Sequence, residues 1–293
     1  MEFFFVSVLN GLSYGLLLFL LSAGLTLILG IMGVLNFAHA SFYMLGAYLG
    51  YALAQYWGFA AALLLAPLLT GLLGAGFEHL VLRRVHSQGH VAELLVTFGL
   101  GYLVLELVQL LWGRAPLSFA LPQALQGASI WLLDLPRSRL FIMAMSLTVL
   151  AGLGWLLHRT RTGLVVQAAM THPDMVQALG HNVSAIRMLV FGVGSALAGL
   201  AGVMGGSTFV TEPAMAGAMG AVVFVVVVVG GMGSLLGAFL ASLLIGLLQT
   251  LALSWDMPLG TLSSARLAPA LPFALMVLML IWRPQGLLGK SGA

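Results

Sequence analysis

The sequence predicts an all-α protein, a polytopic integral membrane helical bundle with about 8–10 transmembrane helices. Of its 293 residues, 61% are hydrophobic and only 6% are charged, against roughly 25% charged residues in a soluble domain. No Asp, Glu, Lys or Arg occurs between Glu2 and Glu78. Because one span needs about 20 apolar residues, that interval alone holds about three spans. We expect residues 1–293 to form a single transmembrane domain, with the lipid bilayer as its surroundings.

The composition also excludes several classes of site and partner. The chain has no cysteine, which removes disulfides, thiol catalysis and thiolate metal sites together. Its N-terminus lacks a basic region and a small-residue cleavage site, so we expect no removable signal peptide. The net charge of +3 comes from few residues. Membrane orientation explains that charge better than nucleic-acid binding does, and we expect no nucleic-acid partner.

The first three spans are expected in the uncharged N-terminal part of the chain. The first covers about residues 5–30, and the second about 33–56, after a glycine-containing break that ends at Gly33. The third covers about 58–82 and ends at Arg83-Arg84. The short basic loop after it is typical of the cytoplasmic side of a membrane.

Three polar residues, Asn36, His39 and Ser41, interrupt the apolar run of the second span. Polar groups at membrane depth are costly and usually face a cavity or a neighbouring helix. The sequence therefore leaves two interpretations open. The three residues either line or gate a translocation pathway, or they form hydrogen bonds from helix to helix.

The next two spans flank the largest non-apolar loop. The fourth span is expected at about 91–112, and the fifth at about 140–157. The loop between them, residues 113–139, contains three prolines and three arginines. The expected topology places this loop on the outer side of the membrane, although its three arginines weaken the charge argument for that side.

Four further spans are expected after residue 187. The sixth, at about 188–206, is rich in glycine, alanine and serine, which lets helix backbones approach closely. The uncharged run from Pro213 to Trp255 is 43 residues long, about twice the length that one span needs. Glycines at 230–233 divide it, which gives spans at about 214–229 and 235–253. The ninth span is expected at about 267–282.

Nine spans place the N-terminus outside and the C-terminus inside, and a re-entrant segment at 30–41 or 207–217 would change this count. With this topology, seven Lys and Arg residues lie inside and four outside, a moderate positive-inside bias. The inside positions are 83, 84, 159, 161, 187, 283 and 290, and the outside positions are 114, 137, 139 and 266.

The polar stretch 158–187 contains a compact helix signal and is expected on the cytoplasmic side. Thr171 or His172 can cap a helix, Pro173 suits its first position, Asp174 suits its positive end and Gly180 supplies a stop. We therefore expect a helix of about two turns over 172–180. A helix this short does not hold itself together in water, so it either docks on a partner or is an ordinary connector.

One face of the expected short helix is apolar. Met175, Val176 and Leu179 lie at spacings that place them together. If the helix docks, these three side chains are expected to fill a groove of the partner, with Asp174, Gln177 and His181 at its rim.

Motifs for catalysis are missing from the sequence, and we assign no catalytic, cofactor-binding or metal-binding residue. Neither G-x-S-x-G nor H-E-x-x-H occurs. Gly289-Lys290-Ser291 resembles the end of a phosphate-binding loop, but the position that needs the first glycine is Pro284. A membrane protein of this kind is expected to be a passive channel, a coupled carrier or one subunit of a larger machine, and not an enzyme.

Five stretches in the same order resemble the permease subunits of bacterial ABC importers, and among them the first permease of the branched-chain amino acid, amide and urea group. They are GLTLILGIMGVLNFAHASFYMLGAY at 24–48, the loop 159–191, SALAGLAGVMGG at 195–206, VVVVVGGMGSLLGAFLASLLIGLLQ at 225–249, and ALMVLMLIWRPQGLLG at 274–289. Two positions depart from the family's pattern: Ala40 stands where glycine is usual, and Gln167 where importer loops generally have an acidic residue.

The resemblance implies the ABC importer permease fold and a location in the bacterial inner membrane. It implies a second, homologous permease subunit, two cytoplasmic ATPase subunits and a periplasmic solute-binding protein as partners. The stretch 158–187 would be the ATPase-coupling loop, and its contact residues would be Pro173, Asp174, Met175, Val176, Leu179 and Gly180. The solute would be a branched-chain amino acid or a similar amino-acid-like molecule, moved from periplasm to cytoplasm.

Two other functions remain open at this point. A passive channel for a small polar solute such as urea or an amide would need no partner and would leave 158–187 free to vary. An ion-coupled carrier would show broken helices with charges in the middle of the membrane. The sequence has no carboxylate pair in the middle of a span.

Overall fold

The computed structural model describes residues 2–33, 35–119, 121–128, 135–255, 258–259 and 262–289, so Lys290 and Ser291 lie outside the described residues. The elements are α1 (Glu2–Met32), α2 (His39–Phe77), the π-helical η1 (Glu78–Leu82), α3 (Arg83–Val85), η2 (His86–Gln88), α4 (His90–Trp112), η3 (Gln123–Leu125), α5 (Arg137–Arg159), α6 (Arg161–Thr171), α7 (Pro173–Ala178), α8 (Val183–Thr208), α9 (Met215–Gly230), α10 (Leu235–Ser254), β1 (Pro258–Leu259), β2 (Leu262–Ser263), α11 (Ser264–Leu267), η4 (Ala268–Ala270) and α12 (Leu271–Trp282). β1 and β2 form one short antiparallel hairpin.

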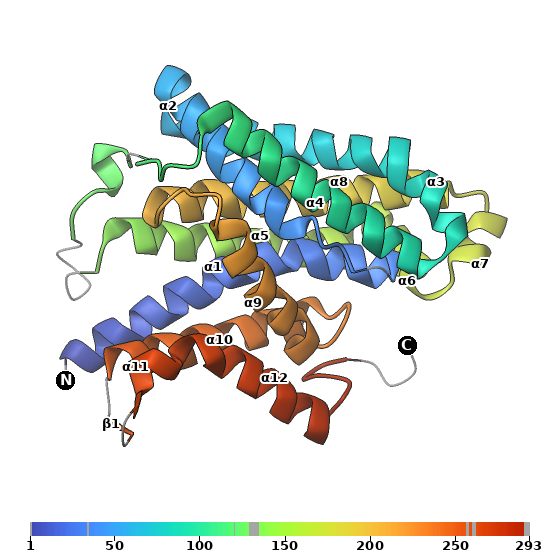
Figure 1. Cartoon of the computed structure of the whole chain (residues 1–293). Helices are drawn as coiled ribbons and strands as arrows, with labels where there is room; N and C mark the ends of the chain where they lie inside the picture. Colours follow the sequence, from blue (N-terminus) through green and yellow to red (C-terminus); the bar gives the residue numbers. More distant parts are fainter. Residues whose placement is uncertain are drawn as a thin grey trace.

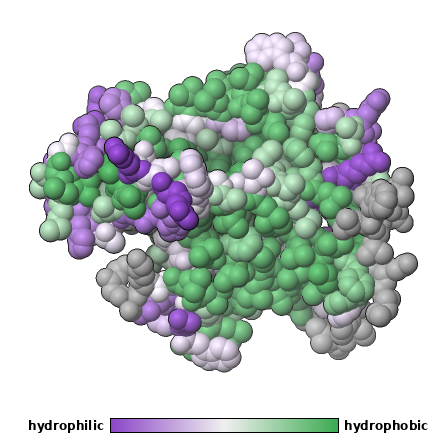
Figure 2. Space-filling model, turned by 180° about the vertical axis from the view of Figure 1, so that it is seen from behind, coloured by the Kyte–Doolittle hydropathy of each residue, from purple (hydrophilic) through white to green (hydrophobic). Residues whose placement is uncertain are grey.

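The all-α membrane fold is confirmed. Seven helices of the described chain are long and apolar enough to cross a membrane, and α9 is a shorter apolar helix. One of the seven is α2, whose two arms each have the length of a span. With these arms taken separately and α9 included, the described residues hold the nine apolar segments that the sequence predicts. Hydrophobic residues form a broad band on the face seen in Figure 2, with hydrophilic residues gathered towards the ends.

Helix α1 is the centre of the bundle. In its most apolar stretch 94% of the residues are buried, and the helix runs between α5 and α8 on one side and α10 on the other (Figure 1). The reason lies in its sequence, because a helix that is apolar all round is stable only when it is enclosed by other helices or lipid. Gly11 and Gly15 let α10 approach, since a Cβ at Gly15 would lie 2.8 Å from the carbonyl oxygen of Ser242.

Helix α2 folds back on itself at Gly58. A continuous helix from His39 to Gln88 has 50 residues, and at 1.5 Å per residue it would be about 75 Å long, more than twice the hydrocarbon core. Gly58 breaks it with φ 80° and ψ 167°, a conformation that favours glycine. Phe191 of α8 contacts Phe42 on the first arm and Phe77 on the second. The two arms therefore run antiparallel along α8, which confirms the predicted boundary between the second and third spans.

The seam between α2 and α8 consists of small residues. A Cβ added to Gly46 would overlap the backbone of Gly199, and one added to Gly202 would overlap the carbonyl oxygen of Tyr43. In lipid no hydrophobic effect drives helices together. They associate through van der Waals contacts, which small residues strengthen by letting the backbones approach closely. The predicted role of the glycine-rich sixth span, tight helix packing, is confirmed.

The polar elements gather at the two ends of the bundle. Helices α3, α6 and α7 lie at one end, together with the C-terminal part of the chain, and the N-terminus lies at the other (Figure 1). The C-terminal segment turns back onto α9, where Leu287 N–H donates to Val229 O at 2.8 Å and Leu288 N–H donates to Gly230 O at 3.1 Å. By the predicted topology, the end with α6 and α7 is the cytoplasmic one.

Candidate functional site

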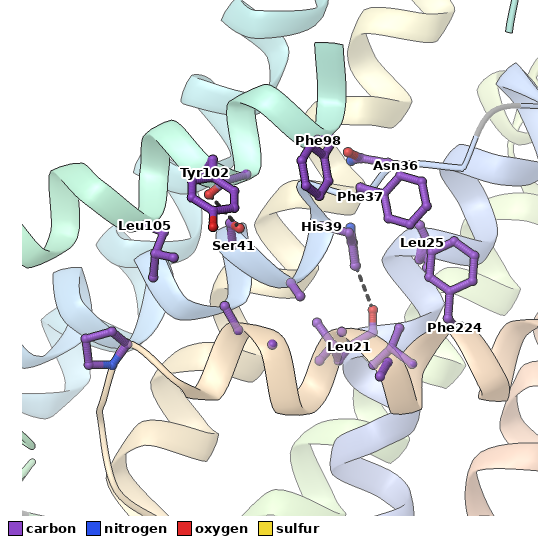
Figure 3. Close-up of a pocket in the computed structure, with 18 residues that line it drawn as sticks. Leu21, Leu25, Asn36, Phe37, His39, Ser41, Phe98, Tyr102, Leu105 and Phe224 are labelled. Carbon is purple, nitrogen blue, oxygen red and sulfur yellow. Dashed lines mark hydrogen bonds between the residues drawn. The ribbon is translucent and has the colours of Figure 1, made fainter. Parts of the chain in front are cut away.

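A cavity of about 370 Å³ opens between four parts of the bundle and contains all three polar residues that the sequence singles out. Asn36, His39 and Ser41 come from the start of α2 and the segment before it, and the other walls come from α1, α4 and α9 (Figure 3). The sequence placed 33–38 inside the second span. The structure instead ends α1 at Met32, gives Gly33 a φ of 66° and begins α2 at His39.

This break lies halfway across the bundle. Phe37 N–H donates to Thr97 Oγ1 at 3.4 Å, and Ser41 Oγ donates to Gly101 O at 3.1 Å. Both partners are near the middle of α4, which runs from His90 to Trp112. Irregular backbone at membrane depth is tolerated only where it is buried in protein or lines a cavity. The first turn of α2, with its partial positive charge, therefore lies at the cavity wall.

The three polar residues form hydrogen bonds within the bundle, as the second interpretation of the sequence expects, and all three line the cavity. Asn36 Oδ1 accepts from Ala38 N–H at 3.1 Å, and His39 Nε2–H donates to Leu21 O of α1 at 2.9 Å. Each nonetheless keeps a buried nitrogen, Asn36 Nδ2 and His39 Nδ1, without a partner among the described residues. An unpaired buried polar group is costly. Both residues line the cavity.

Aromatic rings from three separate elements stand beside the polar residues. Phe37 stacks on Phe224 of α9, with ring centroids 5.3 Å apart and an interplanar angle of 18°, and meets Phe98 of α4 edge-on at 6.4 Å. Phe98 in turn contacts Tyr102 at 5.8 Å. The sequence analysis missed these four residues, because nothing in the order of the residues says that rings so far apart along the chain meet. Phe98 and Tyr102 are more than half exposed on the open side of the cavity.

The predicted short helix in 158–187 is present at the polar end of the bundle. It is α7, which follows the cap residue His172, has Pro173 in its first turn and stops before Gly180, whose φ is 87°. His172 makes no side-chain capping hydrogen bond, and the side chain of Thr171 donates to the preceding turn instead. The helix boundaries are thus confirmed, while the predicted side-chain cap is not found.

The rest of 158–187 is more ordered than predicted. An additional helix, α6, begins after Thr160, whose Oγ1 accepts from Gly163 N–H at 3.0 Å. Gln167 Nε2–H donates to Leu157 O at 2.8 Å, which folds α6 back against the end of α5. α8 begins at Val183, five residues earlier than the predicted sixth span. Helices α6 and α7 therefore form a compact projection.

The apolar residues of α7 do not all face outward. Met175 and Leu179 are 66% and 79% exposed, as expected of residues that would fill a partner's groove. Val176 is 4% exposed, because it packs with Ala169 of α6 and Val183 of α8. The prediction that all three side chains fill a groove is wrong for Val176, which holds the projection together from inside. Asp174 is exposed beside Met175.

Comparison with known proteins identifies similar chains over nearly the full length. A family described as "Branched-chain amino acid transport system / permease component" matches residues 7–280. The high-affinity branched-chain amino acid transport system permease protein BraD of Pseudomonas aeruginosa is 27% identical, over 97% of this chain and 95% of the relative. The corresponding LivH protein of Escherichia coli K12 is 26% identical, over 98% of this chain and 96% of the relative.

Two further similarities are more distant. The permease protein LivM of Escherichia coli K12 is 29% identical, over 92% of this chain and 67% of LivM. Among solved structures, PsaBC from Streptococcus pneumoniae in complex with Fab has a TM-score of 0.51 and 12% sequence identity, and covers 94% of this chain and 91% of that chain. At that level of identity the likeness extends to the fold alone.

Proposed function

The chain belongs to the family of branched-chain amino acid transport system permease components, and we propose that it is one transmembrane subunit of an ATP-binding-cassette importer. Its solute would be a branched-chain amino acid or a similar small amino-acid-like molecule, moved from periplasm to cytoplasm. The proposal places this multi-pass membrane protein in the bacterial inner membrane. The observation that carries it is the cavity inside the bundle, between the end of α1 and the start of α2, where three buried polar side chains line the wall.

The chemistry of the cavity suits an amino acid with an apolar side chain. The partial positive charge at the start of α2 favours the carboxylate of the solute, as in transporters whose broken helices point their N-termini at anionic groups. Leu21, Leu25 and Val223 offer an apolar wall for a branched side chain. The stacked rings of Phe37 and Phe224 would close the route in this conformation.

The open side of this cavity supports a second permease subunit as partner. Phe98 and Tyr102 are 55% and 59% exposed there, and a path lined by a single chain would face lipid at this edge. The chain is similar to both LivH and LivM, which fits a pair of related permeases. We propose that the second permease completes the wall of the translocation path.

The projection formed by α6 and α7 supports a docking role at the polar end. Two cytoplasmic ATPase subunits would drive transport, with the exposed Met175 and Leu179 seated in one of them. The rigid packing of Val176 beneath them would let a movement of the ATPase reach α8 and, through the glycine seam, α2. A periplasmic solute-binding protein would deliver the solute at the opposite end.

Alanine substitutions test the assignment of the cavity. Asn36→Ala, His39→Ala and Ser41→Ala are each expected to lower solute uptake by about tenfold, because losing a buried hydrogen-bonding group costs about 1–3 kcal/mol. Uptake into proteoliposomes that contain the assembled importer is the measurement, with size-exclusion chromatography to check assembly. Ser22→Ala is the matched control, since Ser22 is fully buried on α1 and donates only to its own helix at Phe19 O. Normal uptake by all three variants would remove these residues from the pathway.

A further inference from the structure

A second cavity, of about 340 Å³, lies at the end of the bundle opposite α6 and α7 and shares no lining residue with the first. Its floor is the first half of α1, including Asn10 and Tyr14, and its walls come from the start of α5, the end of α10 and η4. Tyr14 meets Phe209, the residue that ends α8, with ring centroids 6.4 Å apart. The cavity therefore sits at the depth where the spans end, at the predicted outer surface of the membrane.

One charge dominates this second cavity. Arg139, in the first turn of α5, is the single cation among the lining residues, and those residues include no carboxylate. Among the residues that the structure describes, Arg139 forms no ion pair. Its main-chain oxygen accepts from Ser13 Oγ of α1 at 3.4 Å, which fixes the start of α5 over the cavity. A cation that is partly withdrawn from water without a counter-charge attracts an anionic group.

Two amides beside Arg139 have unsatisfied acceptors. Gln249 of α10 donates through Nε2 to Ala268 O at 3.4 Å, while its Oε1 has no donor among the described residues. Asn10 Oδ1 on α1 also has no donor among the described residues. Both side chains line the cavity. A ligand that offers a hydroxyl or ammonium donor next to an anionic group would satisfy the cation and the acceptors at once.

The surroundings of the cavity are apolar. Phe209 and Leu253 at its edge are 50% and 58% exposed, and Leu17 and Ile142 form part of its wall. A freely soluble anion gains nothing from such a surface, whereas an amphiphile places its acyl chain against it. A guanidinium holds a phosphate through two parallel hydrogen bonds, which makes Arg139 a suitable ligand for a phosphodiester.

We propose that this cavity binds a phospholipid of the outer leaflet, with its phosphate on Arg139 and its headgroup hydroxyl or ammonium donating to Asn10 and Gln249. The bound lipid would brace α5 and α10 against α1, since α5 and α10 both pack on α1 and make little contact with each other. This site does not depend on the proposed transport function.

The test compares two neighbouring arginines in the purified, detergent-solubilised protein. Arg139→Gln removes the cation from the cavity, and Arg137→Gln removes an exposed cation two residues away that does not line it. Thermal unfolding and native mass spectrometry are recorded with added dioleoylphosphatidylglycerol, inorganic phosphate or free leucine. We expect the lipid to raise Tm and remain bound to the wild type and to Arg137→Gln, and its affinity to fall at least tenfold in Arg139→Gln.

Three results would overturn the proposal. Equal lipid binding by the two arginine variants would mean that Arg139 only extends to the membrane surface. Stabilisation of the wild type by inorganic phosphate alone would indicate a site for a free anion, and stabilisation by leucine alone a site for a solute. Should Arg139→Gln fail to fold, Gln249→Met replaces it, because it removes only the amide. We then expect Gln249→Met to lower the affinity for the lipid. An affinity equal to that of the wild type would also refute the site.

Discussion

Gly202→Leu is expected to prevent the protein from folding. At Gly202 even a Cβ atom would overlap the carbonyl oxygen of Tyr43 and approach Ala47 N within 2.8 Å. Both contacts are with backbone atoms of the first arm of α2, so no side chain can rotate away. Overpacking a tight core costs about 1–3 kcal/mol and occasionally more, and here the separation of two helices would also open the small-residue seam.

Fluorescence-detected size-exclusion chromatography of the protein extracted from membranes measures this effect. Gly76→Leu on the second arm of α2 is the control, because an added Cβ there meets nothing within 4 Å. Replacing glycine inside a helix by a better helix former is expected to stabilise by up to about 1 kcal/mol. A monodisperse peak of normal height for Gly202→Leu, or equal losses in both variants, would contradict the close packing of α2 and α8.

Leu179→Asp is expected to detach the ATPase while leaving the membrane fold intact. Leu179 is 79% exposed at the end of α7, so its replacement removes little packing within the chain. Burying one such side chain in a partner's groove contributes about 1.5–3 kcal/mol, and an unpaired carboxylate there adds a penalty. Each 1.4 kcal/mol is a factor of about ten in affinity, so the complex should weaken by about 10-fold to 100-fold or more.

Co-purification of the ATPase subunits with the tagged permease measures this loss. Val210→Asp supplies the control, since Val210 is 53% exposed but lies after α8, at the predicted outer end. It should leave the co-purification of the ATPase subunits unchanged. If the Leu179→Asp variant keeps both the complex with the ATPase subunits and the solute-stimulated ATP hydrolysis, α6 and α7 form only a connector, and the proposed coupling role is refuted.

The spans themselves could be predicted from the sequence, because membrane thickness sets the length of an apolar run. The division at Gly58 is an example: the run was too long for one span, and glycine there adopts a positive φ. The hairpin of α9 and α10 follows the same reasoning, with Gly231 at φ 99° and Gly233 at φ 77° between the two helices.

The contents of the site could be predicted only in part. Asn36, His39 and Ser41 were identifiable because polar groups are rare in an apolar span. The rings of Phe37 and Phe224 carry no such signal, since an aromatic residue in a membrane helix usually faces lipid or core. Their contact depends on how α9 packs against the break before α2, which is a property of the tertiary fold.

The stretch 158–187 shows a different limit of prediction from sequence. Pro173 and Gly180 correctly predicted where α7 begins and ends. The spacing rule, however, placed Val176 on the outer face, because it considers one helix without its neighbours. The sequence analysis did not predict α6, although Thr160 is a favourable N-cap residue. His86 and His90 both lie beside the buried Glu93 of α4, where His90 Nδ1 is 3.4 Å from Glu93 Oε2. The helical spacing of the two histidines is visible in the sequence, but their contact with Glu93 is not.

Uptake of a radiolabelled branched-chain amino acid by proteoliposomes tests the central claim most directly. The chain is reconstituted alone, and again with its second permease and two ATPase subunits, with the binding protein on the outside and ATP enclosed. The account predicts uptake against a gradient only in the complete assembly with ATP, and neither ATP hydrolysis nor solute flux by the single chain. Solute flux through the single chain, down its gradient and without ATP, would contradict the account and identify a passive channel.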